Sequence, residues 1–356
     1  MSRRINFDAG PAALPDAVLQ EAAKAVIEYK HSGSSILEIA HRGPLFKEIL
    51  EEANELVRSL LQLDDSYEVI WMQGGGRLQF AMVPMNFLDG AQTAGYIDSG
   101  HWAAEALDQA GLYGNTLILG SSRADKYRYI PGYESVPEHL SYLHFTTNNT
   151  IYGTQWKELP ETNVPLIADM SSELFSRRLD YNKFSMLYAV AQKNIGPAGV
   201  TLVVIRKEML EKQVRPLPGI LSYRDMAEAG SVLNTPPVFA IYCSLLTLRW
   251  IQQKGLDAIE EENRAKAALL YDTIDNSDLF YGVADKESRS LMNVCFRLKD
   301  ESLQDLMLQF AAARNITGIK GHRSVGGFRA SLYNAISYEQ TAVLANALRA
   351  FELAHK

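Results

Sequence analysis

The sequence predicts an α/β protein with a mostly parallel sheet in a large domain and a smaller C-terminal α/β domain. Short apolar runs alternate with segments of helical periodicity along most of the chain, a pattern typical of parallel strands joined by helices. The 356 residues are also enough to bury two hydrophobic cores. We place the large domain at residues 16–260, and the small domain at residues 261–356 together with an N-terminal arm, residues 1–15.

The first strand of the sheet is predicted after two helices. Residues 15–29 and 45–61 carry apolar side chains at helical spacing and are predicted helices. Residues 67–73, YEVIWMQ, predict a buried strand that ends at three glycines, and residues 77–88 predict the next helix. Six further apolar runs complete the predicted sheet: residues 93–99, 116–122, 142–147, 164–170, 186–192 and 201–207.

Two long helices are predicted to lead from the large domain into the small one. Pro236 suits the first turn of a helix, and Gly255 suits its end just after Lys254. Residues 257–276 predict the second helix, which bridges to the small domain. A strand, a helix and a strand are then predicted at residues 292–298, 301–315 and 326–334.

The composition excludes several classes of function. A formal net charge of −7 argues against a general nucleic-acid-binding protein, which is usually basic. No apolar run approaches the roughly 18–20 residues that span a bilayer, and the N-terminus lacks the apolar core of a secretory signal. Cys243 and Cys295 lie outside any C-x-x-C pattern and no H-E-x-x-H is present, so neither disulfides nor a metal site is predicted. We therefore expect a cytoplasmic protein without nucleic-acid or membrane partners.

A lysine at the end of a predicted strand is the first candidate for chemistry. Lys193 follows a mostly apolar run and precedes the turn sequence NIGPAG. Ligands of α/β proteins usually bind at the carboxyl edge of the sheet, and a partly desolvated lysine there can act as a nucleophile or form a Schiff base. From this stretch alone, an ordinary surface cation is equally compatible with the residues.

An aspartate upstream favours the chemical interpretation. Asp169 ends the run VPLIAD, and it reaches the same carboxyl edge as Lys193 if the two strands are parallel in one sheet. A carboxylate there can pair with a protonated ring nitrogen, as pyridoxal phosphate (PLP) requires in order to withdraw electrons. The alternative is that Asp169 caps the segment SSELF that follows it.

The glycine run after the first strand suits a phosphate group. QGGGRLQF combines a strand end, three glycines and a helix start, so bare amides at the helix N-terminus would face an anion. The run matches neither G-x-G-x-x-G nor the P-loop, and alone it also fits an ordinary turn. Because Asp169 and Lys193 follow it in the chain, the three features together favour a PLP site.

Two cationic loops indicate a small substrate with an anion at each end. EIAHRGPLF holds His41 and Arg42, and IKGHRSVGGFRASLYN holds His322, Arg323 and Arg329. Either loop alone is compatible with a solvated basic surface. Arg329 differs because it lies within a predicted buried strand, where its guanidinium needs an anion and fits a carboxylate.

Three other segments carry aromatic or polar candidates. Trp102 in SGHWAAEA could stack on a planar cofactor, or could belong to the core at a helix start. Thr150 in TTNNTIYG, and Asn234 with Thr235 before PPVF, could supply hydrogen bonds to a ligand. Taken singly, Thr150, Asn234 and Thr235 are better interpreted as turn and cap residues.

The sequence resembles the phosphoserine aminotransferase family, PLP enzymes of fold type I in the class-V aminotransferase group. The resemblance covers nearly the whole chain and rests on nine blocks in the family's order: FDAGPAALP, HRGPLF, GGGRLQFAMVP, DSGHWA, NNTIYG, ADMSS, AQKNIGPAG, NTPP and KGHRSVGGFRASLYNA. It implies a large domain with a mostly parallel seven-stranded sheet and a smaller C-terminal domain.

The resemblance also implies a role for each candidate residue. Lys193 would bind PLP covalently, Asp169 would pair with the ring nitrogen and Trp102 would stack on the ring. The other residues would line the cofactor (Gly76, Arg77, Thr150, Gln192), reach the cofactor phosphate of the neighbouring subunit in a homodimer (Asn234, Thr235), take the substrate α-carboxylate (Arg329), or surround its distal anion (His41, Arg42, His322, Arg323).

The implied reaction transfers the amino group of L-glutamate to 3-phosphooxypyruvate and yields O-phospho-L-serine and 2-oxoglutarate in serine biosynthesis. The family also forms 4-phosphohydroxy-L-threonine in pyridoxine biosynthesis, and no residue of the sequence selects between the two keto acids. Three alternatives stay open: a serine– or alanine–glyoxylate aminotransferase, whose substrates lack a second anion; a cysteine desulfurase, which needs a mobile cysteine; and a PLP-binding protein without catalysis.

Overall fold

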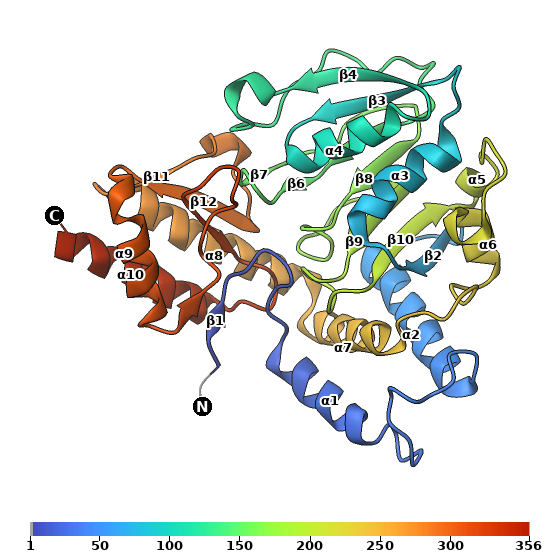
Figure 1. The fold of residues 1–356 in the computed structure, drawn as a ribbon, viewed down its shortest axis with the longest axis horizontal. Coiled ribbons are helices and arrows are strands. Elements are labelled where there is room, and N and C mark those ends of the chain that lie inside the picture. Colours follow the sequence, from blue (N-terminus) through green and yellow to red (C-terminus); the bar gives the residue numbers. More distant parts are fainter. Residues whose placement is uncertain (1–2, 356) are drawn as a thin grey trace.

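A computed structural model describes residues 3–355 of the chain (Figure 1). No helix among these residues is both long enough and apolar enough to cross a membrane. The α-helices are α1 (Asp16–Ile27), α2 (Pro44–Leu61), α3 (Gly75–Phe87), α4 (His101–Ala110), α5 (Lys207–Leu210), α6 (Tyr223–Glu228), α7 (Val238–Lys254), α8 (Leu256–Asp275), α9 (Gln304–Ala312) and α10 (Tyr338–His355). The strands are β1 (Ile5–Asn6), β2 (Tyr67–Met72), β3 (Thr93–Asp98), β4 (Asn115–Ser121), β5 (Leu143–Thr146), β6 (Asn148–Asn149), β7 (Thr154–Gln155), β8 (Leu166–Asp169), β9 (Met186–Val190), β10 (Thr201–Arg206), β11 (Phe280–Gly282), β12 (Asn293–Leu298), β13 (Ile316–Thr317) and β14 (Phe328–Ser331).

The large region contains one seven-stranded sheet among the described residues, in the order β2-β10-β9-β8-β5-β3-β4. All seven strands occupy segments that were predicted as strands. Neighbours from β9 to β4 pair in parallel, whereas β10 runs antiparallel to both β2 and β9. The predicted mostly parallel sheet is therefore confirmed, with one reversed strand that the sequence pattern did not indicate.

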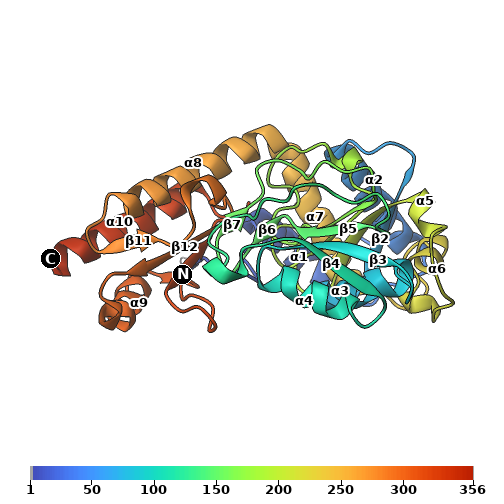
Figure 2. The ribbon, with the colours of Figure 1, turned by 90° about the horizontal axis from the view of Figure 1, so that it is seen from above.

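Helices cover both faces of this sheet (Figure 2). One core packs α1, α2 and α7 against the sheet, and the other packs α3, α4 and α6 against the opposite face. Successive side chains of a strand point to opposite faces. In β9, Leu187 and Ala189 accordingly join the first core, while Met186 and Tyr188 join the second. Burial on both faces explains why these strands are continuous apolar runs.

The small region has a core of its own. β11, β12 and β14 form an antiparallel sheet, and α8, α9 and α10 contribute apolar side chains to the same core. The N-terminal arm joins it, since β1 pairs with β13 and Phe7 is fully buried there. The predicted boundary at residue 260 falls within α8, whose Ile259 packs in the large core and Leu270 in the small one. The helix α10 was not predicted.

The carboxyl edge of the large sheet positions the candidate residues. β8 and β9 are parallel neighbours, so Asp169 and the segment after β9 reach the same edge, as the sequence interpretation required. β9 ends at Val190, earlier than predicted, because the chain turns at Ala191, whose carbonyl accepts the N–H of Gly196 at 2.7 Å. This turn carries Lys193.

Candidate active site

A cavity of about 260 Å³, here called the lysine cavity, lies at this edge of the sheet. Its walls come from the glycine turn, the start of α4, the end of β8 and the turn after β9. It is lined by Gly74, Gly75, Gly76, Arg77, Phe80, Trp102, Asp169, Ser171, Val190, Gln192 and Lys193. Four segments that are distant in the sequence therefore meet here, and each contributes at least one residue that the sequence had singled out.

Lys193 is partly buried in this cavity, in surroundings that lower the pKa of its amine. Its Nζ donates to Thr150 Oγ1 at 3.2 Å. Burial lowers the pKa of Lys193 to about 8, while the negative charge of Asp169 opposes this shift and the positive charge of Arg329 adds to it. More of the amine is therefore unprotonated near neutral pH than in a solvated lysine, and the unprotonated form is the one that reacts with an aldehyde.

Asp169 makes the local capping contact and also lines the lysine cavity. Its side chain is 5% exposed and lines the lysine cavity. Its Oδ1 accepts the backbone N–H of Ser171 at 2.9 Å, which is the local capping contact of the alternative interpretation. That hydrogen bond orients the carboxylate, whose negative charge is then available to a positively charged ring nitrogen in the cavity.

The glycine turn offers backbone amides to an anion. Gly74 and Gly75 have φ of +91° and +70°, and a Cβ on Gly74 would lie 2.3 Å from Leu78 Cδ2, so the turn requires glycine. No side chain of the described residues caps α3, whose first amides are therefore open to an anion. The guanidinium of Arg77 is bound to Glu105. Arg77 can therefore contact an anion at the start of α3 through its backbone amide.

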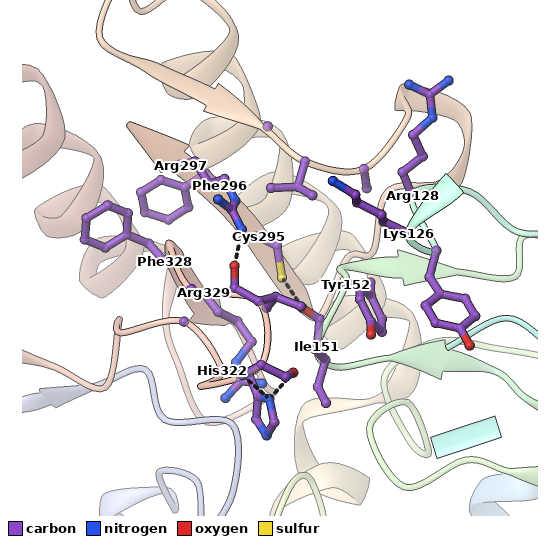
Figure 3. A pocket seen from close by; sticks show the side chains of 18 of the residues that line it. Lys126, Arg128, Ile151, Tyr152, Cys295, Phe296, Arg297, His322, Phe328 and Arg329 are labelled. Carbon is purple, nitrogen blue, oxygen red and sulfur yellow. Dashed lines mark hydrogen bonds between the residues drawn. The ribbon is translucent and has the colours of Figure 1, made fainter. Parts of the chain in front are cut away.

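A second cavity of about 820 Å³, here called the interdomain cavity, lies between the two regions of the chain (Figure 3). Arg329 and His322 lie side by side in it (Figure 3). Arg329 Nη1 donates to the carbonyl of Thr150 at 3.3 Å, and its Nε is buried without a partner among residues 3–355. A bound carboxylate would satisfy this guanidinium group. Since Thr150 also contacts Lys193, one residue links the arginine to the amine.

His322 and Arg323 lie on the glycine-rich loop that leads into β14. The N–H of Ser324 donates to His322 Nδ1 at 3.3 Å. Burial lowers the pKa of His322, and the positive charges of Arg329, His101 and Arg323 lower it further. Arg323 is exposed on the same loop. The loop therefore presents one partly buried imidazole and one solvated guanidinium beside Arg329.

Six predicted residues line neither cavity. Thr150 contacts Lys193 and Arg329 directly, and Arg323 lies on the loop of His322. The other four are His41, Arg42, Asn234 and Thr235. Arg42 donates to the carbonyl of Leu233 at 3.4 Å, so the loop before α2 contacts the segment that carries Asn234 and Thr235. Asn234 and Thr235 are exposed. His41 Nε2 is buried without a partner among the described residues. The two cationic loops of the sequence are thus separated, and only the C-terminal one reaches the Lys193 side of the same chain.

Two residues of this site were missed from the sequence, His101 and Glu105. SGHWAAEA was considered for Trp102 only. His101 begins α4, and its ring centroid lies 6.1 Å from that of His322. Glu105 binds Arg77 through two hydrogen bonds of 3.0 Å. Their spacing of four residues on a helix is a signal that could have identified the pair.

The cysteines do not suit nucleophilic catalysis. Cys243 lies inside α7 and Cys295 inside β12, and both are buried. Burial raises the pKa of the Cys243 thiol to about 11 and that of Cys295 to about 12. Reactive cysteines are instead partly exposed thiolates in positively charged surroundings. The arrangement argues against a cysteine desulfurase.

Comparison with known sequences places the chain in one family. The model of the aminotransferase class-V family matches residues 4–344. The phosphoserine aminotransferase of Flavobacterium johnsoniae is 48% identical over 353 residues, which covers 98% of this chain and 99% of the relative. The phosphoserine aminotransferase of Bacillus subtilis is 45% identical over 355 residues, covering 99% of each.

Solved structures agree with the sequence relatives. Phosphoserine aminotransferase from Bacillus circulans subsp. alkalophilus matches with a TM-score of 0.97 and 43% identity, covering 99% of both chains. A PLP-bound phosphoserine aminotransferase from Trichomonas vaginalis matches with a TM-score of 0.93 and 35% identity, covering 98% of this chain and 100% of that chain. The chain therefore belongs to the phosphoserine aminotransferases of the aminotransferase class-V family.

Proposed function

We propose that the chain transfers the amino group of L-glutamate to 3-phosphooxypyruvate with PLP as cofactor, giving O-phospho-L-serine and 2-oxoglutarate in serine biosynthesis. The observation that carries the proposal is the position of Thr150. Its hydroxyl lies 3.2 Å from Lys193 Nζ, and its carbonyl lies 3.3 Å from Arg329 Nη1. Thr150 thereby holds the Lys193 amine, which would bind the cofactor, close to the Arg329 guanidinium, which would bind a substrate carboxylate.

The lysine cavity suits each part of PLP. Lys193 supplies an amine for the aldehyde, Asp169 a buried carboxylate for the ring nitrogen, and Trp102 an aromatic face for the ring. The uncapped start of α3 suits the phosphate. When bound, PLP carries the amino group between the two substrates and withdraws electrons from the carbon that loses its proton.

Lys193 Nζ is the proposed general base and acid of the transfer. Its lowered pKa of about 8 lets the amine take a proton from the substrate α-carbon and return it within the same site. Thr150 Oγ1 orients the amine, and Asp169 retains the positive charge of the ring nitrogen throughout. The burial of Lys193 and Asp169 limits the access of water to these groups.

Arg329 is the proposed ligand of the substrate α-carboxylate. Its Nε has no protein partner among residues 3–355, and a planar carboxylate matches the fork of a guanidinium. His322 and Arg323 lie on the adjacent loop and are proposed to bind the distal anion, either the phosphate or the glutamate side-chain carboxylate. Mixed imidazole and guanidinium donors can accept both anions more easily than one rigid pair.

The proposed reaction is tested on the purified protein loaded with PLP. L-Glutamate is expected to bleach the yellow absorption, and 3-phosphooxypyruvate is expected to restore it, with O-phospho-L-serine released. A yellow protein that responds to no amino donor would support a PLP-binding protein without catalysis, and turnover with glyoxylate alone would support a glyoxylate aminotransferase. The same assay with the four-carbon phosphorylated keto acid tests the formation of 4-phosphohydroxy-L-threonine.

A homodimer with shared sites is proposed to explain the roles of His41, Arg42, Asn234 and Thr235. Arg42 contacts the segment of Leu233, and exposed Asn234 follows directly. Leu233 and Ile220 are 38% and 54% exposed, and Leu233 lies against Gly219, next to Ile220. An exposed apolar surface that also carries unused polar groups is typical of an interface. His41, Arg42, Asn234 and Thr235 would then serve the site of the neighbouring subunit.

Mixing two defective variants tests the shared site. Dimers formed from Lys193→Ala and Arg42→Ala subunits are expected to recover about a quarter of wild-type activity, because random pairing gives one intact site in half of the dimers. Lys193→Ala mixed with Arg329→Ala is the matched control. It should stay inactive because both residues belong to the same subunit's site. Equal recovery in the two mixtures, or none in either, would refute shared sites.

The cytoplasm is the proposed location. Cys243 and Cys295 are both free and buried, in α7 and β12. Free thiols persist in compartments where glutathione and thioredoxin keep cysteines reduced. This observation supports a reducing compartment for the enzyme.

A further inference from the structure

One carboxylate at the start of α4 holds two basic side chains. Glu105 accepts Nε and Nη2 of Arg77, each at 3.0 Å, and lies 3.2 Å from His101 Nε2. A proton on His101 Nε2 can be donated to this carboxylate, which only accepts hydrogen bonds. The contact fixes the orientation of the imidazole and leaves its Nδ1 directed away from Glu105.

His101 lies between the cofactor side and the substrate side of the site. It precedes Trp102, whose ring centroid is 4.9 Å away and which lines the lysine cavity. On its other side, its ring centroid is 6.1 Å from that of His322, which lines the interdomain cavity. His101 therefore links helix α4 of the large region to the loop of the small region that carries His322.

The opposite imidazole is a neutral donor. His322 Nδ1 accepts the N–H of Ser324 at 3.3 Å, so its remaining proton lies on Nε2. Burial and the neighbouring positive charges disfavour a second proton on His322. Figure 3 shows this imidazole beside Arg329, in the interdomain cavity. An anion placed next to His322 would therefore lie close to His101 as well.

We propose that His101 is a specificity-determining residue that binds the distal phosphate of the substrate together with His322. This inference rests on the proposed function and deepens it. A phosphate dianion opposite Glu105 would place negative charge on both sides of the His101 imidazole. Its two ring nitrogens could then donate in the two directions, Nε2 to Glu105 and Nδ1 to a phosphate oxygen. Phosphate has three acceptor oxygens and a charge near −2, against two oxygens and −1 for a carboxylate. His101 should therefore matter for the phosphorylated substrate and hardly for glutamate.

The variant His101→Gln tests the inference in the PLP-loaded enzyme. The half-reactions with O-phospho-L-serine and with L-glutamate are followed separately through the cofactor absorption. The KM for O-phospho-L-serine is expected to rise about tenfold, the loss of one charge-assisted hydrogen bond at a partly exposed site. We expect kcat for both substrates and the KM for L-glutamate to stay within about twofold of wild type.

The exposed His139, changed to glutamine, is the matched control and should alter neither substrate. An equal rise in both KM values, a fall in kcat with both substrates, or unchanged kinetics would each overturn the inference. A change with both substrates would indicate that His101 positions Trp102. Unchanged kinetics would indicate that His101 has no role in the site. A wild-type enzyme that does not react with O-phospho-L-serine would overturn the proposed function too. If the wild type reacts with O-phospho-L-serine and the His101→Gln variant shows the same kinetics, only the inference about His101 is overturned.

Discussion

Replacing Lys193 with alanine is expected to abolish turnover, with a loss of at least roughly ten-thousand-fold in kcat. The variant removes the amine that we propose both to bind the cofactor and to move the substrate proton. No described side chain other than Thr150 is hydrogen-bonded to Nζ, and a hydroxyl is too weak a base to replace it. The measurement is the rate of O-phospho-L-serine formation, together with the absorption of the bound cofactor.

Added methylamine should restore a trace of this activity, because a small amine can enter the space that Lys193 leaves and take up its proton. The matched control is Lys183→Ala, since Lys183 is an exposed lysine outside both cavities. It should retain wild-type activity. Full activity in Lys193→Ala would contradict the assignment of the catalytic amine. A loss of equal size in Lys183→Ala would show that the effect is not specific to Lys193.

Replacing Asp169 with asparagine is expected to lower kcat by about a hundredfold to a thousandfold, the usual loss when one preorganised electrostatic contact is removed from an active site. Asparagine retains the shape of the side chain and can still accept the N–H of Ser171. Asparagine lacks the negative charge that we propose to hold a proton on the cofactor ring nitrogen. The measurement combines steady-state kinetics with titration of the bound cofactor, which should lose its protonated ring form at lower pH.

Asp180→Asn is the matched control for this effect. Asp180 also accepts a backbone N–H two residues on, that of Asn182 at 3.2 Å, but it lies outside the lysine cavity. Its replacement keeps a capping residue and should leave kcat unchanged. If Asp169→Asn retained wild-type kcat, the role of Asp169 would be reduced to the cap over Ser171 that the sequence also allowed.

The strands of the large sheet could be predicted because each is an apolar run between turn residues. Burial on both faces makes the run continuous, and the glycines and prolines mark its ends. A continuous apolar run does not show whether the strand lies parallel or antiparallel to its neighbours. β10 is buried like its neighbours, yet it runs antiparallel to both. Direction depends on which strands become neighbours, and that information is not local.

The positions of Asp169 and Lys193 at one edge of the sheet could be predicted, because the signal lies within a few residues of each. Each is a charged residue at the end of an apolar run, and the carboxyl edge of a parallel sheet brings such positions together. The sequence could not predict that the two cationic loops lie at different places in the fold. His322 and Arg329 line the interdomain cavity, whereas Arg42 contacts Leu233 on a different surface. The sequence shows two similar loops and does not show which one reaches the amine of its own chain.

The α/β class, the positions of the strands and the residue types at their ends could all be predicted from the sequence, because they follow from hydrophobic periodicity and turn chemistry within short segments. Only the tertiary structure decided which side chains meet. Arg329 and Thr150 are 179 residues apart, and Arg77 and Glu105 come from two helices. Such contacts depend on how the segment around β14 packs against the Thr150 loop and on how α3 lies beside α4. The four-residue spacing of His101 and Glu105 is visible in the sequence, but only the fold shows that the pair lies beside Arg77 and His322.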